Sequence, residues 1–364
     1  MLNINVCQEC DVPEPFYQGH EWLNNGDVVQ KANHEARMGI IECEALDPLF
    51  TNVGEIIGMS IFPLIINITS RGSRFYLDNL IPKEFKEMVQ SKTMDLRPLA
   101  EPIFTMCHIM GFGQYDFLDY RYEKDPGDFA RCNIYRPFSV PEVFGCYSGG
   151  VSAMVGGEHS VSYEEISPGL YEVVAKWTEF PDILKEKMRI YHYRHKDGDV
   201  ELERCGTCGC PKAFAGYYWD LAKGVIVNGK TGRRMALLGF ELTDRVFTAL
   251  EDELGDTIPR VVVEAQRRFV KTGFYSIEEI QNEQEFRGEL ALRGLGNLLE
   301  LKMTSKGLRM RIDNVSGHLL TIGIAQGLFE EAIDAESFVD WELSDDGNLD
   351  VEVTPRSIKA FIKA

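Results

Sequence analysis

Residues 234–274 read RMALLGFELTDRVFTALEDELGDTIPRVVVEAQRRFVKTGF, and residues 37–76 read RMGIIECEALDPLFTNVGEIIGMSIFPLIINITSRGSRFY. The later stretch is an altered copy of the earlier one, displaced by a constant 234 − 37 = 197 positions. The matched pairs are Arg37/Arg234, Met38/Met235, Phe50/Phe247, Thr51/Thr248, Glu55/Asp252, Ile57/Leu254, Gly58/Gly255 and Ile61/Ile258. Constant spacing over a helix-sized segment indicates that one structural unit occurs twice in the chain.

The repeat continues on both sides of this stretch. Toward the N-terminus, Trp22 matches Trp219, and a Cys-x-x-Cys motif followed by proline recurs at a spacing of 198. Toward the C-terminus, Gly111-x-Gly113 recurs at 183, and four further residues recur at 178: Gly145/Gly323, Gly149/Gly327, Val161/Val339 and Gly169/Gly347. The spacing falls by 198 − 178 = 20, so we expect the second copy to have lost loop residues while keeping its elements.

Each copy predicts helices first and an antiparallel set of strands afterwards, with one buried helix among the strands. The expected helices are 47–69, 82–90 and 144–157 in the first copy, and 243–271, 276–292 and 318–333 in the second. Pro63 and Pro259 predict a break in the longest helix of each copy, and Thr243 or Asp244 is the expected cap of helix 243–271. The glycines of segment 144–157 indicate close packing against another backbone. The expected fold class is therefore α+β, two duplicated units arranged as a pseudo-dimer.

The predicted domains are residues 1–177 and 205–364, joined by a connecting hairpin over 178–204. In that hairpin, Met188–His195 is expected to pair with Asp199–Glu203 across a turn at Lys196-Asp-Gly198.

Composition narrows the class of protein. The chain has 364 residues and a net charge of −19, which disfavours binding to nucleic acid or to an anionic membrane. It contains no apolar run of membrane-spanning length and no visible secretory signal, so the expected location is the cytoplasm. Nine cysteines without a signal peptide favour reduced thiols over a disulfide framework.

The cysteine motifs are the most specific chemical signal. Cys7 and Cys10 stand in the first copy, and Cys205, Cys208 and Cys210 in the second. Zinc takes four thiolates in a tetrahedron, and two Cys-x-x-Cys turns that meet at a pseudo-twofold axis would supply them. The alternatives are free cysteines in two turns, and an iron–sulfur cluster or a redox-active dithiol, for which Cys210 is a spare ligand.

The residues from Arg-Met through Gly-x-Gly, the small-residue helix and a closing β-hairpin resemble the 4-vinyl-reductase, or hydrocarbon-binding, domain family. The resemblance covers residues 37–177 and 234–355 and implies a small apolar pocket between the helices and the sheet. The residues expected to line this pocket are His108, Tyr135, Cys146, Tyr147 and Phe269. The family's own zinc site would use Cys146 with Glu164 or Glu165, but the closing hairpin lacks the cysteines that would complete it.

The leading interpretation is a binding module for a small apolar or aromatic molecule or a hydrophobic cofactor, acting as sensor, carrier or accessory protein. The alternatives are a redox accessory protein or enzyme that depends on a metal or an iron–sulfur cluster, and a scaffold protein that binds no ligand. No catalytic signature occurs, so the sequence favours a protein that is not an enzyme. A protein partner is expected for signal output, and the chain could be a pseudo-dimeric monomer or a homodimer.

Overall fold

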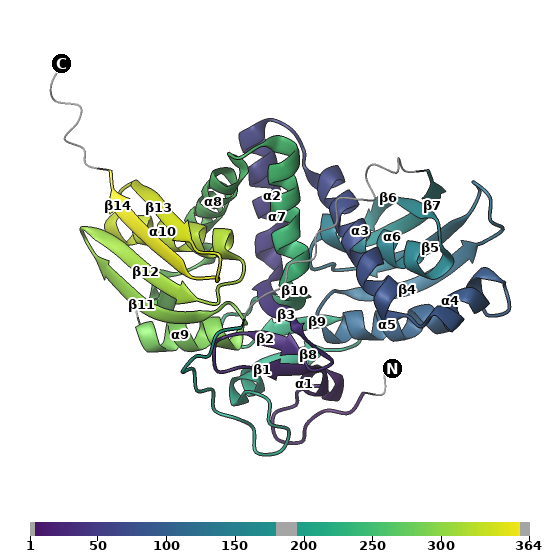
Figure 1. Ribbon diagram of the computed structural model, residues 1–364, viewed down its shortest axis with the longest axis horizontal. Helices are drawn as coiled ribbons and strands as arrows, with labels where there is room; N and C mark the ends of the chain where they lie inside the picture. The colour runs from purple at the N-terminus through teal and green to yellow at the C-terminus, as the bar shows by residue number, and fades with distance from the viewer. Residues whose placement is uncertain (1–3, 180–194, 281, 357–364) are drawn as a thin grey trace.

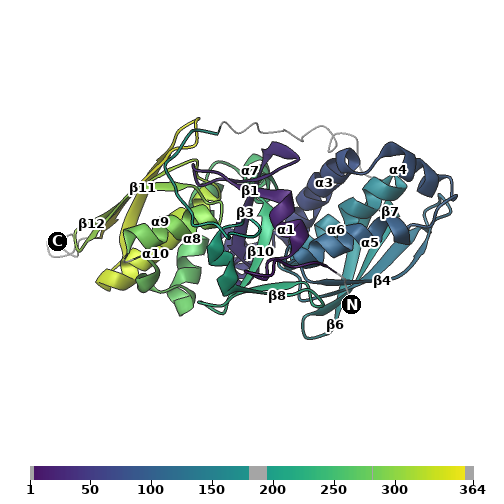
Figure 2. The same cartoon turned by 90° about the horizontal axis from the view of Figure 1, so that it is seen from below.

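The computed structural model describes residues 4–179, 195–280 and 282–356, and it has the expected α+β architecture. Two helices, α2 (Cys43–Ile57) and α7 (Phe240–Leu254), stand side by side above a central sheet (Figure 1). A lobe of helices and antiparallel strands lies on each side of them, and the view from below shows the same arrangement (Figures 1 and 2). The described residues therefore form a duplicated structure with a pseudo-dimeric outline.

The elements of the two halves follow the same order. The first half contains α1 (Glu14–Gly19), β1 (His20–Trp22), β2 (Val28–Gln30), β3 (Asn33–Glu42), α2, α3 (Phe62–Leu80), α4 (Lys83–Gln90), α5 (Arg97–Ile109), β4 (Gln114–Arg121), β5 (Phe129–Tyr135), α6 (Val140–Val155), β6 (Glu158–Ser167) and β7 (Leu170–Thr178). The second half contains η2 (Lys212–Gly216), β8 (Tyr217–Asp220), β9 (Val225–Asn228), β10 (Arg234–Gly239), α7, α8 (Ile258–Phe269), the π-helical turn η3 (Val270–Phe274), η4 (Ile277–Ile280), α9 (Glu283–Leu292), β11 (Asn297–Thr304), β12 (Gly307–Asp313), α10 (His318–Ile333), β13 (Ser337–Leu343) and β14 (Leu349–Pro355).

The central sheet carries the pseudo-twofold axis. Its strand order is β1-β2-β3-β10-β9-β8, so each half supplies three strands and β3 pairs with β10 in the middle. In that antiparallel pair, Ile40 lies opposite Leu237, and these two residues are themselves equivalents at the spacing of 197. A twofold axis must pass between two equivalent residues that face each other, which fixes the axis at this pair.

The two halves exchange their central helices. Helix α2 of the first half packs on α8 of the second, while α7 packs on α3 of the first. The Gly-x-Gly turns also cross the axis: the amide of Gly113 donates to the carbonyl of Gly224, and the amide of Gly296 donates to that of Gly26. A Cβ atom at Gly26 would lie 2.3 Å from the Gly296 backbone, so the two segments can approach this closely only at glycine.

Each lobe packs a glycine-rich helix between a four-stranded antiparallel sheet and a neighbouring helix. The sheets are β4-β5-β7-β6 with α6, and β11-β12-β14-β13 with α10. A Cβ at Gly149 of α6 would lie 2.1 Å from the Ser70 carbonyl oxygen of α3, and one at Gly323 of α10 would lie 2.8 Å from that of Val263 in α8. The prediction that the glycines of segment 144–157 permit close helix packing is confirmed at Gly149, and the second copy shows the same feature at Gly323.

The predicted long helices are each divided in two. Helix α2 ends at Ile57, with Gly58 in the left-handed conformation, and α7 ends at Leu254 before Gly255. Pro63 and Pro259 then stand in the first turn of the next helix, where a missing N–H costs no hydrogen bond. The predicted cap at Thr243 or Asp244 is wrong, because α7 begins at Phe240 with Gly239 as its N-cap.

Two other local predictions differ from the structure. The predicted helix 276–292 is confirmed in its second part, α9, which ends at Leu292 as predicted; its first part is a short 3₁₀ turn, η4, and α9 has its own N-cap, Asn282, which accepts hydrogen bonds from the amides of Gln284 and Glu285. The connecting hairpin is absent from its described part, because Asp199–Glu203 forms no strand; Met188–Arg194 lies outside the described residues. The domain boundaries at 177 and 205 stay a prediction.

Several short elements were not expected. Strands β1, β2, β8 and β9 have only three or four residues each, which is too short for a clear alternation of apolar and polar side chains. Helix α5 contains both Pro98 and Pro102 and so resembles a loop in sequence.

Candidate functional site

Four cysteines, two from each half, meet at the pseudo-twofold axis. The sulfur atoms of Cys7, Cys10, Cys205 and Cys208 all lie within 4.8 Å of one another. The Sγ atoms of Cys7 and Cys205 are 3.7 Å apart, and those of Cys10 and Cys208 are 3.5 Å apart. A tetrahedral ion with Zn–S bonds of about 2.3 Å requires sulfur separations of about 3.8 Å. The four side chains could therefore hold one metal ion, with two ligands from each half of the protein.

The two cysteine turns have the same backbone fold. The amide of Cys7 donates to the carbonyl of Val12, and at the equivalent position the amide of Cys205 donates to that of Cys210. The fourth residue after each of these cysteines has positive φ, 56° at Asp11 and 73° at Gly209. Glycine adopts this conformation freely and aspartate tolerates it, so both turns close in the same way and present both sulfurs to one point.

A cluster of aromatic rings supports the cysteine turns. Phe16 and Phe214, equivalents at a spacing of 198, meet at the axis with ring centroids 5.5 Å apart. Each ring also packs across the axis on the other half's tryptophan: Phe16 lies 5.3 Å from Trp219, and Phe214 lies 5.2 Å from Trp22. This symmetric core joins the two halves next to the cysteine turns.

One thiol in the cluster is more acidic than the others. The pKa of Cys7 is lowered to about 7: burial opposes ionisation, but the amides of Glu9 and Cys10 and two neighbouring thiols donate hydrogen bonds to the sulfur. Burial raises the pKa of Cys10 and of Cys208. Thiolates are the ligand form for metal ions, so this cluster has one sulfur ready to bind at neutral pH.

Cys210 does not belong to the four-sulfur cluster, although the sequence marked it as a spare ligand. Its backbone carbonyl closes the second cysteine turn, and its side chain is buried in the adjacent core. The structure thus brings together four of the five predicted metal-ligating cysteines.

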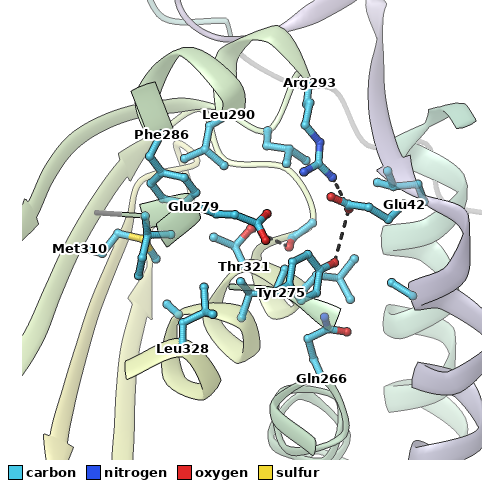
Figure 3. A pocket seen from close by; sticks show the side chains of 18 of the residues that line it. Glu42, Gln266, Tyr275, Glu279, Phe286, Leu290, Arg293, Met310, Thr321 and Leu328 are labelled. Atoms are coloured by element: carbon cyan, nitrogen blue, oxygen red, sulfur yellow. Dashed lines mark hydrogen bonds and ion pairs between the residues drawn. The ribbon is translucent and has the colours of Figure 1, made fainter. Parts of the chain in front are cut away.

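A cavity of about 80 Å³ lies in the second lobe. It is bounded by the end of β3 and the start of α2 from the first half, and by α8, η4, α9, α10 and the sheet of the second half (Figure 3). The apolar side chains around it are Ile41, Ala45, Leu46, Leu49, Ile280, Phe286, Leu290, Leu295, Leu301, Leu308, Met310, Leu320, Ile324, Ala325 and Leu328. Because α2 comes from the other half, the cavity exists only in the assembled pair of repeats.

Polar side chains gather at one end of the cavity. Figure 3 shows Glu42 ion-paired with Arg293, and the Tyr275 hydroxyl donates to the Glu42 carboxylate at 3.4 Å. The second acidic residue of the lining, Glu279, pairs with Arg233 at 2.7 Å. Gln266 is buried at the same end, and its Oε1 atom has no hydrogen-bond partner.

The first lobe differs at the positions equivalent to this polar end. At the spacings of 197 and 183, Glu42 corresponds to Gly239, Gln266 to Thr69, and Arg293 to Met110. Ala325 of the cavity wall corresponds to Tyr147 at the spacing of 178. The two lobes share a fold, but only the second has this buried charge pair and amide.

None of the five residues predicted to line a pocket lies on this cavity. His108 joins the two halves instead: its Nδ1 lies 3.0 Å from the Leu221 carbonyl oxygen, and its Nε2 accepts from the amide of Tyr115. Tyr135, Cys146 and Tyr147 lie in the first lobe, on β5 and α6. Phe269 packs against Tyr275, which does line the cavity, with ring centroids 6.2 Å apart. Their role in ligand binding stays a prediction.

The sequence analysis did not identify the cavity residues, although one feature of the sequence pointed to them. Gln266 interrupts an apolar stripe that runs through Val262, Ala265 and Phe269 at helical spacing. A polar residue on such a buried face needs a partner or a function. Glu42 and Arg293 could not have been paired from the sequence, because they are 251 positions apart.

Comparisons with known proteins give little further information. No family model matches the chain, and no curated protein matches it. Among solved structures, a Cs H-NOX mutant with the unnatural amino acid 4-cyano-L-phenylalanine has a TM-score of 0.25 and 13% identity, covering 33% of this chain and 75% of that one. An oxygen-binding H-NOX domain related to soluble guanylate cyclases has a TM-score of 0.23 and 14% identity, covering 32% of this chain and 72% of that one. TM-scores this low carry no argument about fold or ligand.

Within the described residues, no helix has both the length and the apolar character needed to cross a membrane.

Proposed function

We propose that this protein is a small-molecule-binding module in which the second lobe holds an apolar ligand and a four-cysteine zinc site joins the two halves. The observation that carries the binding function is the cavity itself, an apolar chamber with a few polar groups at one end, which is the usual composition of a ligand site. Its volume of about 80 Å³ suits a ligand of few heavy atoms, since about 150 Å³ accommodates benzene.

The difference between the lobes supports this proposal. Burying a polar group costs free energy unless the group forms hydrogen bonds or ion pairs. An ion pair and an amide at one end of the cavity therefore favour a binding site over a packing defect. In the first lobe, the residues equivalent to Glu42 and Arg293 are the uncharged Gly239 and Met110. We infer that the second lobe is specialised for binding and that the first lobe supplies helix α2 as part of the wall.

Zinc is proposed as the metal because four thiolates around one point form a typical structural zinc site. A cluster with several iron atoms would need its cysteines spread around more than one metal position, which the compact arrangement of the four sulfurs disfavours.

We also propose that the chain is a duplicated relative of the hydrocarbon-binding domain family. The proposal is supported by the order of elements in both halves, with the Gly-x-Gly turn, the glycine-rich helix and the closing hairpin in sequence.

Binding can be tested by filling the cavity. Ala325→Leu adds three carbon atoms to the cavity wall on α10, whereas Ala332→Leu makes the same change at an exposed position of the same helix. We expect the parent protein and Ala332→Leu to bind the small ring compounds cyclobutanol or cyclobutanone in ligand-observed NMR, and Ala325→Leu to bind at least about tenfold more weakly. If neither compound binds the parent protein, or if both leucine variants bind like the parent, the cavity is not a ligand site.

A further inference from the structure

Residues 195–203 lie across the junction between the first half and the second lobe. The amide of Val200 donates to the Asn24 carbonyl oxygen of the first half at 2.7 Å. The amide of Lys196 donates to Oδ1 of Asn314, which follows β12 in the second lobe, at 3.3 Å. Polar contacts therefore attach this stretch to both parts of the protein.

His195, at the start of this stretch, has an acceptor at each ring nitrogen. Its Nδ1 lies 2.7 Å from a carboxylate oxygen of Asp27, and its Nε2 lies 2.8 Å from the backbone carbonyl oxygen of His34. A neutral imidazole carries one N–H group, whereas an imidazolium carries two. Only the protonated ring can donate to both oxygens, so this geometry requires a positively charged His195.

The Asp27 carboxylate is buried beside the ring. It is 1% exposed, pairs with the Arg37 guanidinium and accepts a hydrogen bond from the side-chain amide of Asn25 at 2.9 Å. The hydrogen bond to Asp27 raises the pKa of His195 above its ordinary value of 6.5, whereas burial and the positive charge of Arg37 oppose this rise. The charges around the ring therefore favour its protonated form, in agreement with the two acceptors.

Asp27 has no acidic counterpart in the second half. By the register of the strand pairs β2–β3 and β9–β10, it corresponds to the uncharged Val225. The neighbouring arginine does have an equivalent: Arg37 and Arg234 each donate to a backbone carbonyl oxygen of a lobe. The acid that holds His195 therefore belongs to one side of the axis, the side along which residues 195–203 run.

We propose that His195 is a pH-sensitive contact that holds residues 195–203 on the first half tightly when its ring is protonated and weakly when its ring is neutral. A neutral ring directs a lone pair at one of the two oxygens, so one hydrogen bond is lost and the other is no longer charge-assisted. Hydrogen bonds to charged groups contribute a factor of roughly ten or more to such an equilibrium. The inference is independent of the proposed ligand and metal sites.

The direction of the pH dependence follows from the raised pKa of His195. The stabilising contact is fully present below 6.5, the ordinary pKa, and is lost as the pH rises through the higher pKa of the folded protein.

The first test is the titration of the ring in the full-length protein, followed by NMR of its Cε1 proton and assigned by the absence of that signal from His195→Gln. We expect a pKa above 6.5 in the parent protein and a lower pKa in Asp27→Asn. A parent pKa at or below 6.5, or an unchanged pKa in Asp27→Asn, would overturn the proposal. The parent titration decides alone if Asp27→Asn does not fold, since Asp27 also pairs with Arg37.

The second test measures the attachment by hydrogen-exchange mass spectrometry, with each rate divided by the intrinsic rate of an unfolded chain at the same pH. In the parent protein, we expect protection of the peptide that contains Val200 to fall roughly tenfold between about pH 6 and about pH 8.5. Protection around Gly113, whose amide crosses the junction on the other side of the axis, should stay unchanged.

Two variants show whether His195 causes this fall. His195→Gln has no titrating ring at this position and should show the lower protection of Val200 at both pH values. The control His34→Gln keeps the backbone carbonyl that accepts from His195 and should behave like the parent protein. Constant protection in the parent, or a tenfold fall that persists in His195→Gln, would refute the assignment.

Discussion

If the four cysteines bind zinc as proposed, removal of the metal should destabilise the junction between the two repeats, and single cysteine substitutions can test this. Replacing Cys208 by alanine removes one of the four sulfurs within 4.8 Å, whereas replacing Cys210 removes a neighbouring buried thiol outside that group. Cys210 is the more deeply buried of the two. If packing alone mattered, Cys210→Ala would therefore be the more harmful change. A metal site predicts the opposite order.

The expected size of the effect follows from linkage between binding and folding. Metal at about a thousand times its dissociation constant stabilises the folded protein by about 4 kcal/mol. The entropy of unfolding near 60 °C is about 2.1 cal/mol/K per residue. For a chain of 364 residues this is roughly 0.8 kcal/mol per degree, so the loss of that stabilisation lowers the melting temperature by about 5 °C.

The assay combines metal analysis with thermal unfolding. We expect one zinc per chain in the parent protein and in Cys210→Ala, and much less in Cys208→Ala, which should melt about 5 °C below the parent in zinc-containing buffer. A chelator should lower the melting temperature of the first two proteins and leave Cys208→Ala unchanged. A parent protein without bound metal after purification and incubation with zinc would refute the metal site. A coloured protein containing iron would refute zinc as its occupant.

Two further predictions concern the first lobe and the helix packing. Burial, together with the nearby Asp47 carboxylate, raises the pKa of Glu142 to about 8 in the folded protein. Because this pKa is above the ordinary value of about 4.5, the folded protein loses stability as the pH rises from about 4.5 toward 8. The variant Glu142→Leu carries the residue type of the equivalent position, Leu320, and has no carboxyl group to titrate there. Between pH 5.5 and 8 its free energy of unfolding, measured with denaturant, should therefore rise relative to that of the parent by on the order of 3 kcal/mol. Parallel pH profiles of the two proteins would contradict this. Gly149→Ala should destabilise by about 1–3 kcal/mol, because the new methyl group would lie 2.1 Å from the Ser70 carbonyl oxygen. Gly288→Ala on α9, with nothing within 4 Å, should stabilise by about 1 kcal/mol in the same assay, and equal effects would show that helix propensity alone decides.

The repeat spacing predicted the architecture because equivalent residues must occupy equivalent places. The spacing of 198 between the cysteine motifs placed Cys7 beside Cys205 at an axis, and helix α10 begins and ends at the residues predicted for it, His318 and Ile333. In contrast, helix ends depend on which residue closes each turn, and Gly58 and Gly255 end helices that their apolar stripes alone would continue.

The cavity could not be predicted from the sequence for a different reason. A repeat shows that α2 and α7 are equivalent, but not whether each packs within its own half or on the other. Both arrangements bury the same apolar faces, so the hydrophobic pattern is identical in the two cases. Only the exchanged arrangement brings Glu42 to Arg293 and closes the cavity with α2.

The exchange of central helices gives the two copies a physical advantage from being joined in one chain. Each lobe is completed by a helix of the other copy, and the glycine contacts, the tryptophan rings and the cysteine pairs all cross the same axis. Two separate copies would have to associate before either could bury its core, at a cost in translational and rotational freedom that a covalent connection largely removes. Fusion then frees the halves to diverge. One lobe can lose the polar residues at its cavity positions while the other keeps or gains them, because the shared axis, and not the identity of the lobes, holds the fold together.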